Sequence, residues 1–266
     1  MPSCPILTYH SQLLFGNDYG TNSHVGLAED LEVIAASGRR IVALQALVDG
    51  LVSGHSDLDL DTVVCITFDD GCDFDWLDIE HPQLGLQLGF GTILRRHKER
   101  YPGQLVHATS FVLADPAARA TISQTDLGHV WMNDIWWAEA EASGLVAIES
   151  HGLDHRHHGI APGNADYGHF HAVADAATCQ EQIDHASDLI QARSGRRPRL
   201  FAYPYGQTSD YLRHDYLPRF EARHGIQAAI ATEPAHFHWG SDRWFIPRYV
   251  SLQDWHSPEE LARLLA

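Results

Sequence analysis

The chain has 266 residues, of which 44% are hydrophobic and 20% charged, and this composition is typical of a globular protein rather than a disordered or fibrous one. Its formal net charge is −17, so we expect no binding to nucleic acid, which requires clustered Lys and Arg. No apolar run reaches the roughly 18 residues of a membrane span, and residues 1–5 do not resemble a signal peptide. A cytoplasmic protein is therefore expected, with a trimmed secreted form left open.

Short apolar runs that are typical of buried strands alternate along the chain with patterns of helical spacing. The predicted strands are residues 6–9, 62–68, 105–112, 145–149, 200–202, 227–231 and 244–250. The predicted helices are residues 27–37, 84–100 and 177–193. Strands that alternate with helices pair in parallel through crossover connections. We therefore predict an α/β fold, a distorted (β/α) barrel of about seven parallel strands. No linker divides the chain, so one domain over residues 1–266 is expected.

Four cysteines are present without any Cys-x-x-Cys pair. Cys65 lies inside a predicted strand and Cys179 on the apolar face of a predicted helix. Both are interpreted as small core residues, and a disulfide framework is not expected.

Two adjacent aspartates follow the predicted strand at residues 62–68, in the sequence Asp69-Asp70-Gly71. In parallel α/β barrels this end of a strand opens onto the active-site face. Successive side chains alternate in direction, so one aspartate can ligate a metal while the other faces a bound water. Alone, the motif is more typical of an acidic turn or a helix cap than of a metal site.

A pair of histidines, His151 and His155, follows the predicted strand at residues 145–149. Residues four apart on a helical turn share one face, so these two imidazoles can bind the same ion. One carboxylate and two imidazoles leave coordination positions open, as in catalytic metal sites. With 19 histidines in the chain the pair is weak by itself, but together with Asp69 and Asp70 at another strand end it favours a metal-dependent hydrolase.

These motifs resemble the signatures of the polysaccharide deacetylase (NodB-homology, carbohydrate esterase) family. The segment 67–71, Thr-Phe-Asp-Asp-Gly, is similar to the first signature, and 151–155, His-Gly-Leu-Asp-His, is similar to the second. The segment 203–206, Tyr-Pro-Tyr-Gly, is similar to the third, although on its own it is also typical of a plain exit from a strand.

The resemblance implies a NodB-type barrel and a role for each matching residue. Asp69 would be the catalytic base. Asp70, His151 and His155 would hold one divalent metal ion, for which zinc is the first choice and Co, Ni, Mn or Fe the alternatives. The backbone N–H of Tyr205 would help to bind the oxyanion.

The general acid is expected at His10. Residues 7–10, Leu-Thr-Tyr-His, resemble the opening strand of a circularly permuted subgroup that includes poly-N-acetylglucosamine deacetylases, in which this strand supplies the histidine. His236 and His238 are the rival candidates.

Two positions depart from the family pattern. Gly152 stands where the family usually has Ser or Thr, which predicts the loss of a hydrogen bond beside the metal. Ala202 stands where many members have an Arg that orients the catalytic aspartate. Arg197, Arg199 and Arg248 are candidates to replace that Arg.

The predicted reaction is removal of an acetyl group, as an N-acetyl amide or an O-acetyl ester, from a carbohydrate or another small acylated substrate. Hydrolysis of a non-sugar carbon–nitrogen bond on the same scaffold is the first alternative. A catalytically inactive sugar-binding relative is the second. The sequence leaves the substrate, the native metal and the oligomeric state open.

Overall fold

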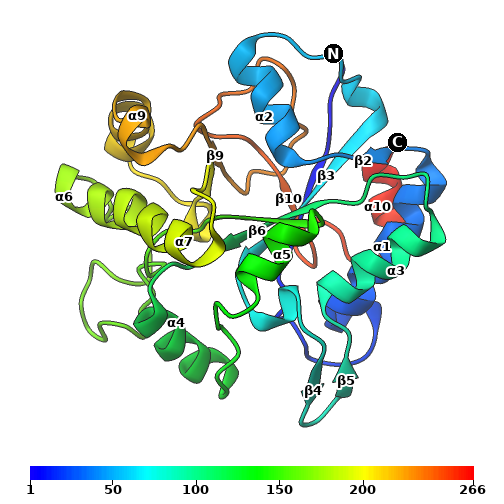
Figure 1. The fold of residues 1–266 in the computed structure, drawn as a ribbon, viewed down its shortest axis with the longest axis horizontal. Coiled ribbons are helices and arrows are strands. Elements are labelled where there is room, and N and C mark those ends of the chain that lie inside the picture. The colour runs from blue at the N-terminus through cyan, green and yellow to red at the C-terminus, as the bar shows by residue number, and fades with distance from the viewer.

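The computed structural model describes residues 1–266, and its centre is a sheet of parallel strands that curls into a half-barrel (Figure 1). Seven strands lie in the order β10-β1-β3-β6-β7-β8-β9, and every neighbouring pair is parallel. Their bounds are β1 (Ile6–Tyr9), β3 (Val63–Asp70), β6 (Ala108–Val112), β7 (Val146–Ser150), β8 (Leu200–Ala202), β9 (Ala228–Ile230) and β10 (Tyr249–Val250). The predicted α/β fold with about seven parallel strands is confirmed.

Two shorter pairings complete the strand pattern. The two-residue strand β2 (Arg40–Ile41) adds in parallel to β3. A single parallel bridge joins Ile230 of β9 to Ile246, three residues before β10. This bridge brings the two edges of the curled sheet together.

Helices surround the sheet on its outer side (Figure 1). The α-helices are α1 (Ser23–Ser37), α2 (Leu44–Ser53), α3 (Phe90–Arg100), α4 (Pro116–Ile122), α5 (Trp137–Ser143), α6 (Ala176–Cys179), α7 (Ala186–Ser194), α8 (Leu217–Arg219), α9 (Glu221–His224) and α10 (Pro258–Leu265). Three π-helical segments, η4 (Ser123–Leu127), η5 (Gln180–His185) and η7 (Tyr211–Tyr216), continue α4, link α6 to α7 and precede α8. The 3₁₀ turns are η1 (Tyr19–Thr21), η2 (Leu60–Thr62), η3 (Asp73–Asp75) and η6 (Pro204–Gly206).

The helix predicted over residues 84–100 is only partly correct. It begins at Phe90, and the preceding residues form β5 (Gly85–Gln87), which pairs in antiparallel fashion with β4 (Ile79–His81). Gly85 has a φ of 72°, a left-handed conformation that suits a turn and not the first turn of a helix. The other two predicted helices are present, as α1 and as the continuous segment from α6 through η5 to α7.

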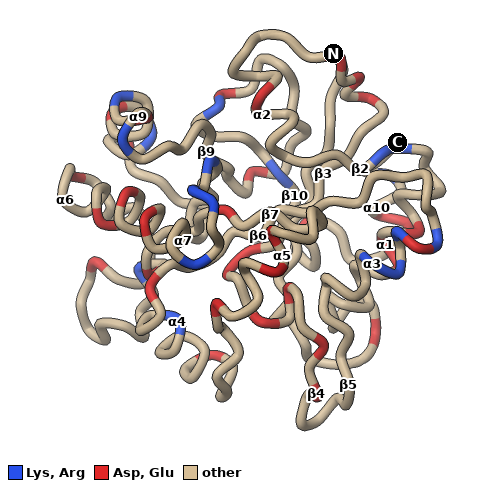
Figure 2. Tube along the Cα trace, in the orientation of Figure 1, with Lys and Arg blue, Asp and Glu red and all other residues tan.

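The strand β3 runs through the middle of the core, and seven of its eight residues are buried. All four cysteines are free and buried, including Cys65 in β3 and Cys179 in α6. No helix combines the length and the apolar character that a bilayer crossing requires. Four basic residues lie on α3 and the other Lys and Arg are scattered, whereas Asp and Glu are spread over most of the outer elements (Figure 2).

Strand register places the candidate site residues at one edge of the sheet. Tyr9 lies opposite Phe68, Asp70 opposite Val112, and Val112 opposite Ser150. Because the pairing is parallel, the residues that follow these strand ends emerge on the same face. The carboxyl edge of the sheet therefore carries the segments that begin at residues 10, 69, 151 and 203.

Candidate active site

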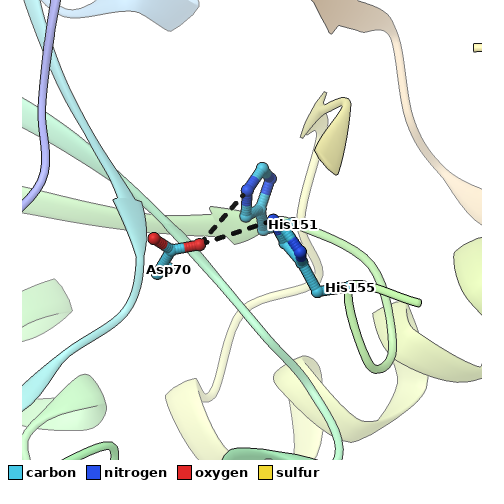
Figure 3. Close-up of side chains that lie close together, drawn as sticks. All are labelled: Asp70, His151 and His155. Carbon is cyan, nitrogen blue, oxygen red and sulfur yellow. Dashed lines mark ion pairs between the residues drawn. The ribbon is translucent and has the colours of Figure 1, made fainter. Parts of the chain in front are cut away.

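Three side chains from two strand ends converge on one point at this edge. Asp70 lies at the end of β3, His151 follows β7, and His155 lies in the loop beyond it (Figure 3). The Nε2 atoms of His151 and His155 are 3.5 Å and 3.6 Å from Oδ1 of Asp70. All three potential ligand atoms lie within 4.8 Å of one another.

This donor set fits a divalent metal ion. Two ligand atoms that are each about 2.1 Å from one ion, at a tetrahedral angle, lie about 3.4 Å apart. The two distances from Asp70 are close to that spacing. Imidazole nitrogens with a carboxylate oxygen suit zinc, and they also suit other first-row metals.

The two histidines do not share a helical turn, so the local structure predicted for them is wrong. The segment that contains them is a loop, in which Gly152, His155 and Arg156 have φ values of 87°, 61° and 48°. Left-handed backbone at non-glycine residues costs free energy and is typical of functional sites. The turn that these residues form, rather than helical spacing, brings His155 next to His151.

Hydrogen bonds set the orientation of His151. Its Nδ1 lies 2.8 Å from the carbonyl oxygen of Ala202, which can only accept a hydrogen bond, so Nδ1 carries the proton. Nε2, which faces Asp70, is then unprotonated and free to bind a metal. Residue 202 therefore acts on the site through its backbone carbonyl, which any residue type at this position would supply.

A buried glutamine that the sequence analysis did not single out braces the histidine loop. The Oε1 atom of Gln182, from η5, accepts a hydrogen bond from the backbone N–H of Leu153 at 3.1 Å. Its Nε2 donates to Oδ1 of Asp154 at 2.8 Å. A Cβ at Gly152 would lie 3.3 Å from Oε1 of Gln182, and the φ of 87° there is unfavourable for Ser or Thr. Gln182 therefore holds the loop in place, and the absence of a side chain at Gly152 leaves room for it.

The other aspartate of the pair is held by an arginine. Arg248, which is fully buried, donates from Nη1 to Oδ1 of Asp69 at 2.8 Å and from Nη2 to Oδ2 at 2.5 Å. Its Nε donates to the carbonyl oxygen of Ala231 at 2.8 Å, which fixes the guanidinium group. Of the three arginines considered as replacements for an Arg at position 202, Arg248 is the one that contacts Asp69. Arg197 and Arg199 instead pair with Asp188 and Asp49.

Electrostatics keep Asp69 ionised. Burial alone would raise the pKa of this carboxyl, but the positive charge of Arg248 outweighs it and holds the pKa well below its usual range. The Oδ2 atom of Asp69 is 4.0 Å from Nε2 of His151. A buried carboxylate with a lowered pKa therefore lies beside the three-ligand cluster.

His10 lies across a cavity of about 210 Å³ that Asp69, Asp70, His151 and His155 also line. It follows β1, whose neighbour in the sheet is β3. His236 and His238 do not line this cavity, and Nδ1 of His236 instead pairs with the hydroxyl of Tyr249 at 2.9 Å. The structure therefore places His10, and not its two rivals, beside Asp69.

Tyr205 borders the same cavity in a strained conformation. Its φ is 57°, and its ring lies edge-on to that of His155, with 4.2 Å between the ring centroids. The next residue, Gly206, also has a positive φ, and a Cβ there would lie 1.9 Å from Oγ1 of Thr232. Only glycine fits at position 206, which fixes the path of the backbone at Tyr205.

Two polar residues behind Asp70 were also missed by the sequence analysis. Gln12 donates from Nε2 to Oδ2 of Asp70 at 2.5 Å, on the side away from the histidines. Asp75 is buried nearby and accepts hydrogen bonds from the hydroxyls of Ser11 and Ser110, each at 2.6 Å. Burial raises the pKa of Asp75 to about 8. Nothing in the sequence around Gln12 or Asp75 distinguishes them from ordinary polar residues.

Comparison with known proteins finds similarity to polysaccharide deacetylases. Residues 102–218 match the family model described as polysaccharide deacetylase, and this stretch includes His151, His155 and Tyr205. No curated protein sequence matches the chain.

Solved structures of similar fold include three deacetylases. The Streptococcus pyogenes deacetylase PplD in complex with acetate shares 15% identity at a TM-score of 0.66, with 100% of both chains covered. IcaB from Ammonifex degensii shares 18% identity at a TM-score of 0.66, with 100% of this chain and 97% of that chain covered. The de-N-acetylase from Aggregatibacter actinomycetemcomitans shares 18% identity at a TM-score of 0.64, with 97% and 99% covered. Likenesses at this level of identity show the fold, and with the family-model match they confirm the resemblance to the polysaccharide deacetylase family.

Proposed function

We propose that this chain is a metal-dependent hydrolase that removes acetyl groups from a carbohydrate. Its resemblance to the polysaccharide deacetylase family supports carbohydrate deacetylation. The bond cleaved would be an N-acetyl amide or an O-acetyl ester. The observation that carries the proposal is the cluster of Asp70, His151 and His155 beside a separate carboxylate, Asp69, that an arginine keeps charged. Residues 1–266 would act as one catalytic domain, because the proposed site draws on positions from 10 to 248.

Asp70, His151 and His155 would hold the metal ion, with zinc as the first choice and Co, Ni, Mn or Fe as alternatives. A divalent ion bound there would polarise the acyl carbonyl and lower the pKa of a coordinated water. The protein contributes the orientation of the ligands. The carbonyl of Ala202 fixes the tautomer of His151, and Gln12 fixes the carboxylate of Asp70 from behind.

Asp69 would be the general base that takes the proton from the attacking water. Arg248 holds both carboxylate oxygens in place and holds the pKa of the group below its usual range. General-base catalysis of this kind is worth about 10²–10⁴-fold in rate.

The two remaining roles fall to residues across the cavity. The backbone N–H of Tyr205 would donate to the oxyanion of the tetrahedral intermediate, since its path is fixed by Gly206. His10 would protonate the leaving nitrogen, because an unprotonated amine is a very poor leaving group. Both assignments rest on position, as both residues line the cavity that Asp69 and Asp70 share.

Metal analysis combined with an acetate-release assay tests the proposal. The purified protein is expected to carry about one equivalent of a divalent metal, as one three-ligand cluster implies, and to release acetate from an N-acetylated sugar or oligosaccharide. Metal content with cleavage only of non-acetyl amides would favour the non-sugar amide hydrolase instead. Protein that binds sugar but neither holds metal nor releases acetate would contradict the proposal in favour of an inactive sugar-binding relative.

A further inference from the structure

A second cavity, of about 160 Å³, lies on the other side of the proposed metal ligands. Asp70, His155 and Tyr205 line both this cavity and the polar cavity that contains His10. The two cavities therefore meet at the place where the acyl carbonyl would be bound.

The second cavity is apolar on the side away from those ligands. Leu113, Ile122 and Met132 form a small buried cluster of their own, separate from the main core, and Leu127 packs against it. All four side chains line the cavity, and so does Cys72. They come from the end of β6, from α4 and η4, and from the loop before α5.

Polar side chains make up the rest of the lining of this cavity. Nε2 of His157 and Oδ2 of Asp126 form an ion pair at 3.1 Å, which links η4 to the histidine loop. Gln12 is engaged with Asp70. The thiol of Cys72 donates to the carbonyl oxygen of Trp131 at 3.0 Å, so it too has a partner. No charged side chain belongs to the apolar cluster that forms the far wall.

The chemistry of the proposed reaction indicates which part of the substrate each cavity would bind. In the hydrolysis of an amide, the oxygen of water bonds to the acyl carbon, the carbon–nitrogen bond breaks, and the nitrogen leaves with an added proton. The acyl substituent and the leaving nitrogen point in different directions from that carbon. His10, the proposed proton donor, lines the polar cavity alone. The leaving amine therefore belongs in the polar cavity, and the acyl substituent belongs in the apolar one.

The size of the apolar cavity exceeds what an acetyl group requires. A cavity of about 150 Å³ lined by aliphatic side chains holds a whole benzene molecule. Asp70 and His155 line part of this 160 Å³, so a bound metal ion would take some of it, and one methyl group would still leave space against the apolar wall unfilled. On the basis of the proposed function, we propose that the acyl site of this enzyme, besides taking the acetyl group, binds acyl groups of about four to six carbons, straight or cyclic, more tightly. Leu127, Ile122, Leu113 and Met132 would be the residues that determine this specificity.

The test compares N-acetylglucosamine with N-butyrylglucosamine. Affinity is measured by calorimetry on protein stripped of metal, which does not turn the compounds over, and kcat/KM is measured on the metal-loaded protein. The two extra methylenes of the butyryl group are expected to tighten binding about tenfold and to raise kcat/KM by a similar factor. Leu127→Trp fills the cavity and is expected to abolish the butyryl preference while acetyl binding is retained. Ile122→Phe fills it from a neighbouring position, in case Leu127→Trp does not fold.

Val130→Trp is the matched control, because Val130 lies three residues after Leu127 but is 59% exposed. It is expected to leave the preference for butyryl over acetyl unchanged. Equal binding of the two compounds to the wild type would overturn the inference, and so would a butyryl preference that survives both Leu127→Trp and Ile122→Phe. Failure of the proposed function looks different, because metal-loaded protein would then cleave neither compound whatever their relative affinities.

Discussion

Arg248 donates two parallel hydrogen bonds to Asp69, although 179 positions separate the two residues in the sequence. The pair joins the segment just before β10 to the end of β3, across the place where the sheet curls on itself. Both side chains are buried, so water cannot solvate either charge if its partner is removed. The orientation and charge of the proposed base therefore depend on a single residue from the far end of the chain.

Replacing this arginine with an uncharged residue should weaken both the fold and the site. Arg248→Met leaves Asp69 as an unpaired buried carboxylate, and the free energy of unfolding is expected to fall by about 3–5 kcal/mol in urea titrations. Without the positive charge the pKa of Asp69 rises, so the acid limb of the pH–rate profile should shift upward. Arg197→Met, which breaks the half-exposed pair with Asp188, is the control and should cost less than about 1 kcal/mol. A comparable small loss for Arg248→Met would contradict this account of the pair.

The two aspartates should separate metal binding from turnover. Asp70→Ala removes the carboxylate that both histidines face, so bound metal and activity are expected to disappear together. Asp69→Asn keeps the three-ligand cluster intact, so metal should be retained while kcat falls about 10²–10⁴-fold. Metal content by mass spectrometry and acetate release would be measured on the same samples. An active Asp69→Asn protein would show that the base is assigned to the wrong residue.

The role of His10 can be tested by changing the leaving group. His10→Gln is expected to lower kcat for an N-acetyl amide by about 10²–10⁴-fold, because the amine must be protonated to leave. Hydrolysis of 4-nitrophenyl acetate should be much less affected, since nitrophenolate departs without a proton. His236→Gln, at a histidine outside the cavity, should change neither rate. Equal losses with the amide and the ester would argue that His10 acts in substrate binding or in the attack of water.

Much of the site could be predicted from the sequence because it depends on local pattern. A buried apolar run predicts a strand, and parallel strands present their carboxyl ends on one face, so residues after two such runs can be expected to meet. Asp70, His151 and His155 follow that rule. The helical turn predicted for the two histidines was nevertheless wrong. A loop with left-handed backbone at His155 brings its imidazole next to that of His151.

The residues that support the site could not be predicted in the same way. Gln12, Gln182 and Arg248 act through contacts across 58, 29 and 179 positions, and each looks like an ordinary polar residue in its own segment. Three arginines were equally plausible partners for the site, and only packing in three dimensions selects Arg248. The hairpin of β4 and β5 was missed because its apolar residues are also compatible with a helix extended from α3.

Gln182 should affect metal affinity although it is not one of the proposed ligands, because it contacts the loop that carries His151 and His155. Gln182→Met removes both hydrogen bonds to the histidine loop, and metal affinity is expected to fall about 10–100-fold. Because the backbone N–H of Leu153 is left unsatisfied in a buried position, stability should fall by about 1–3 kcal/mol. Gln180→Met, on the exposed face of the same π-helical segment, is the matched control. Unchanged zinc affinity in a competition titration with a chelator would show that the loop holds its shape without Gln182.

Asp75 should make the stability of the metal-free protein depend on pH. The dependence is expected between the pKa of Asp75 in the unfolded chain and its pKa in the folded protein. Burial raises its pKa from an ordinary value of 3.8 to about 8, so the folded protein keeps a proton that the unfolded chain has released. Over that interval the folded state binds more protons, and the free energy of unfolding therefore falls as pH rises. Asp75→Asn cannot titrate but can still hydrogen-bond to Ser11 and Ser110. In urea unfolding with a chelator present, the free energy of unfolding of Asp75→Asn should rise relative to that of the wild type from about pH 4 to about pH 8. Above about pH 8 the difference should stay constant. Parallel stability curves for the two proteins would mean that Asp75 is ionised in the folded state, and that the two serine hydroxyls are sufficient to stabilise its charge.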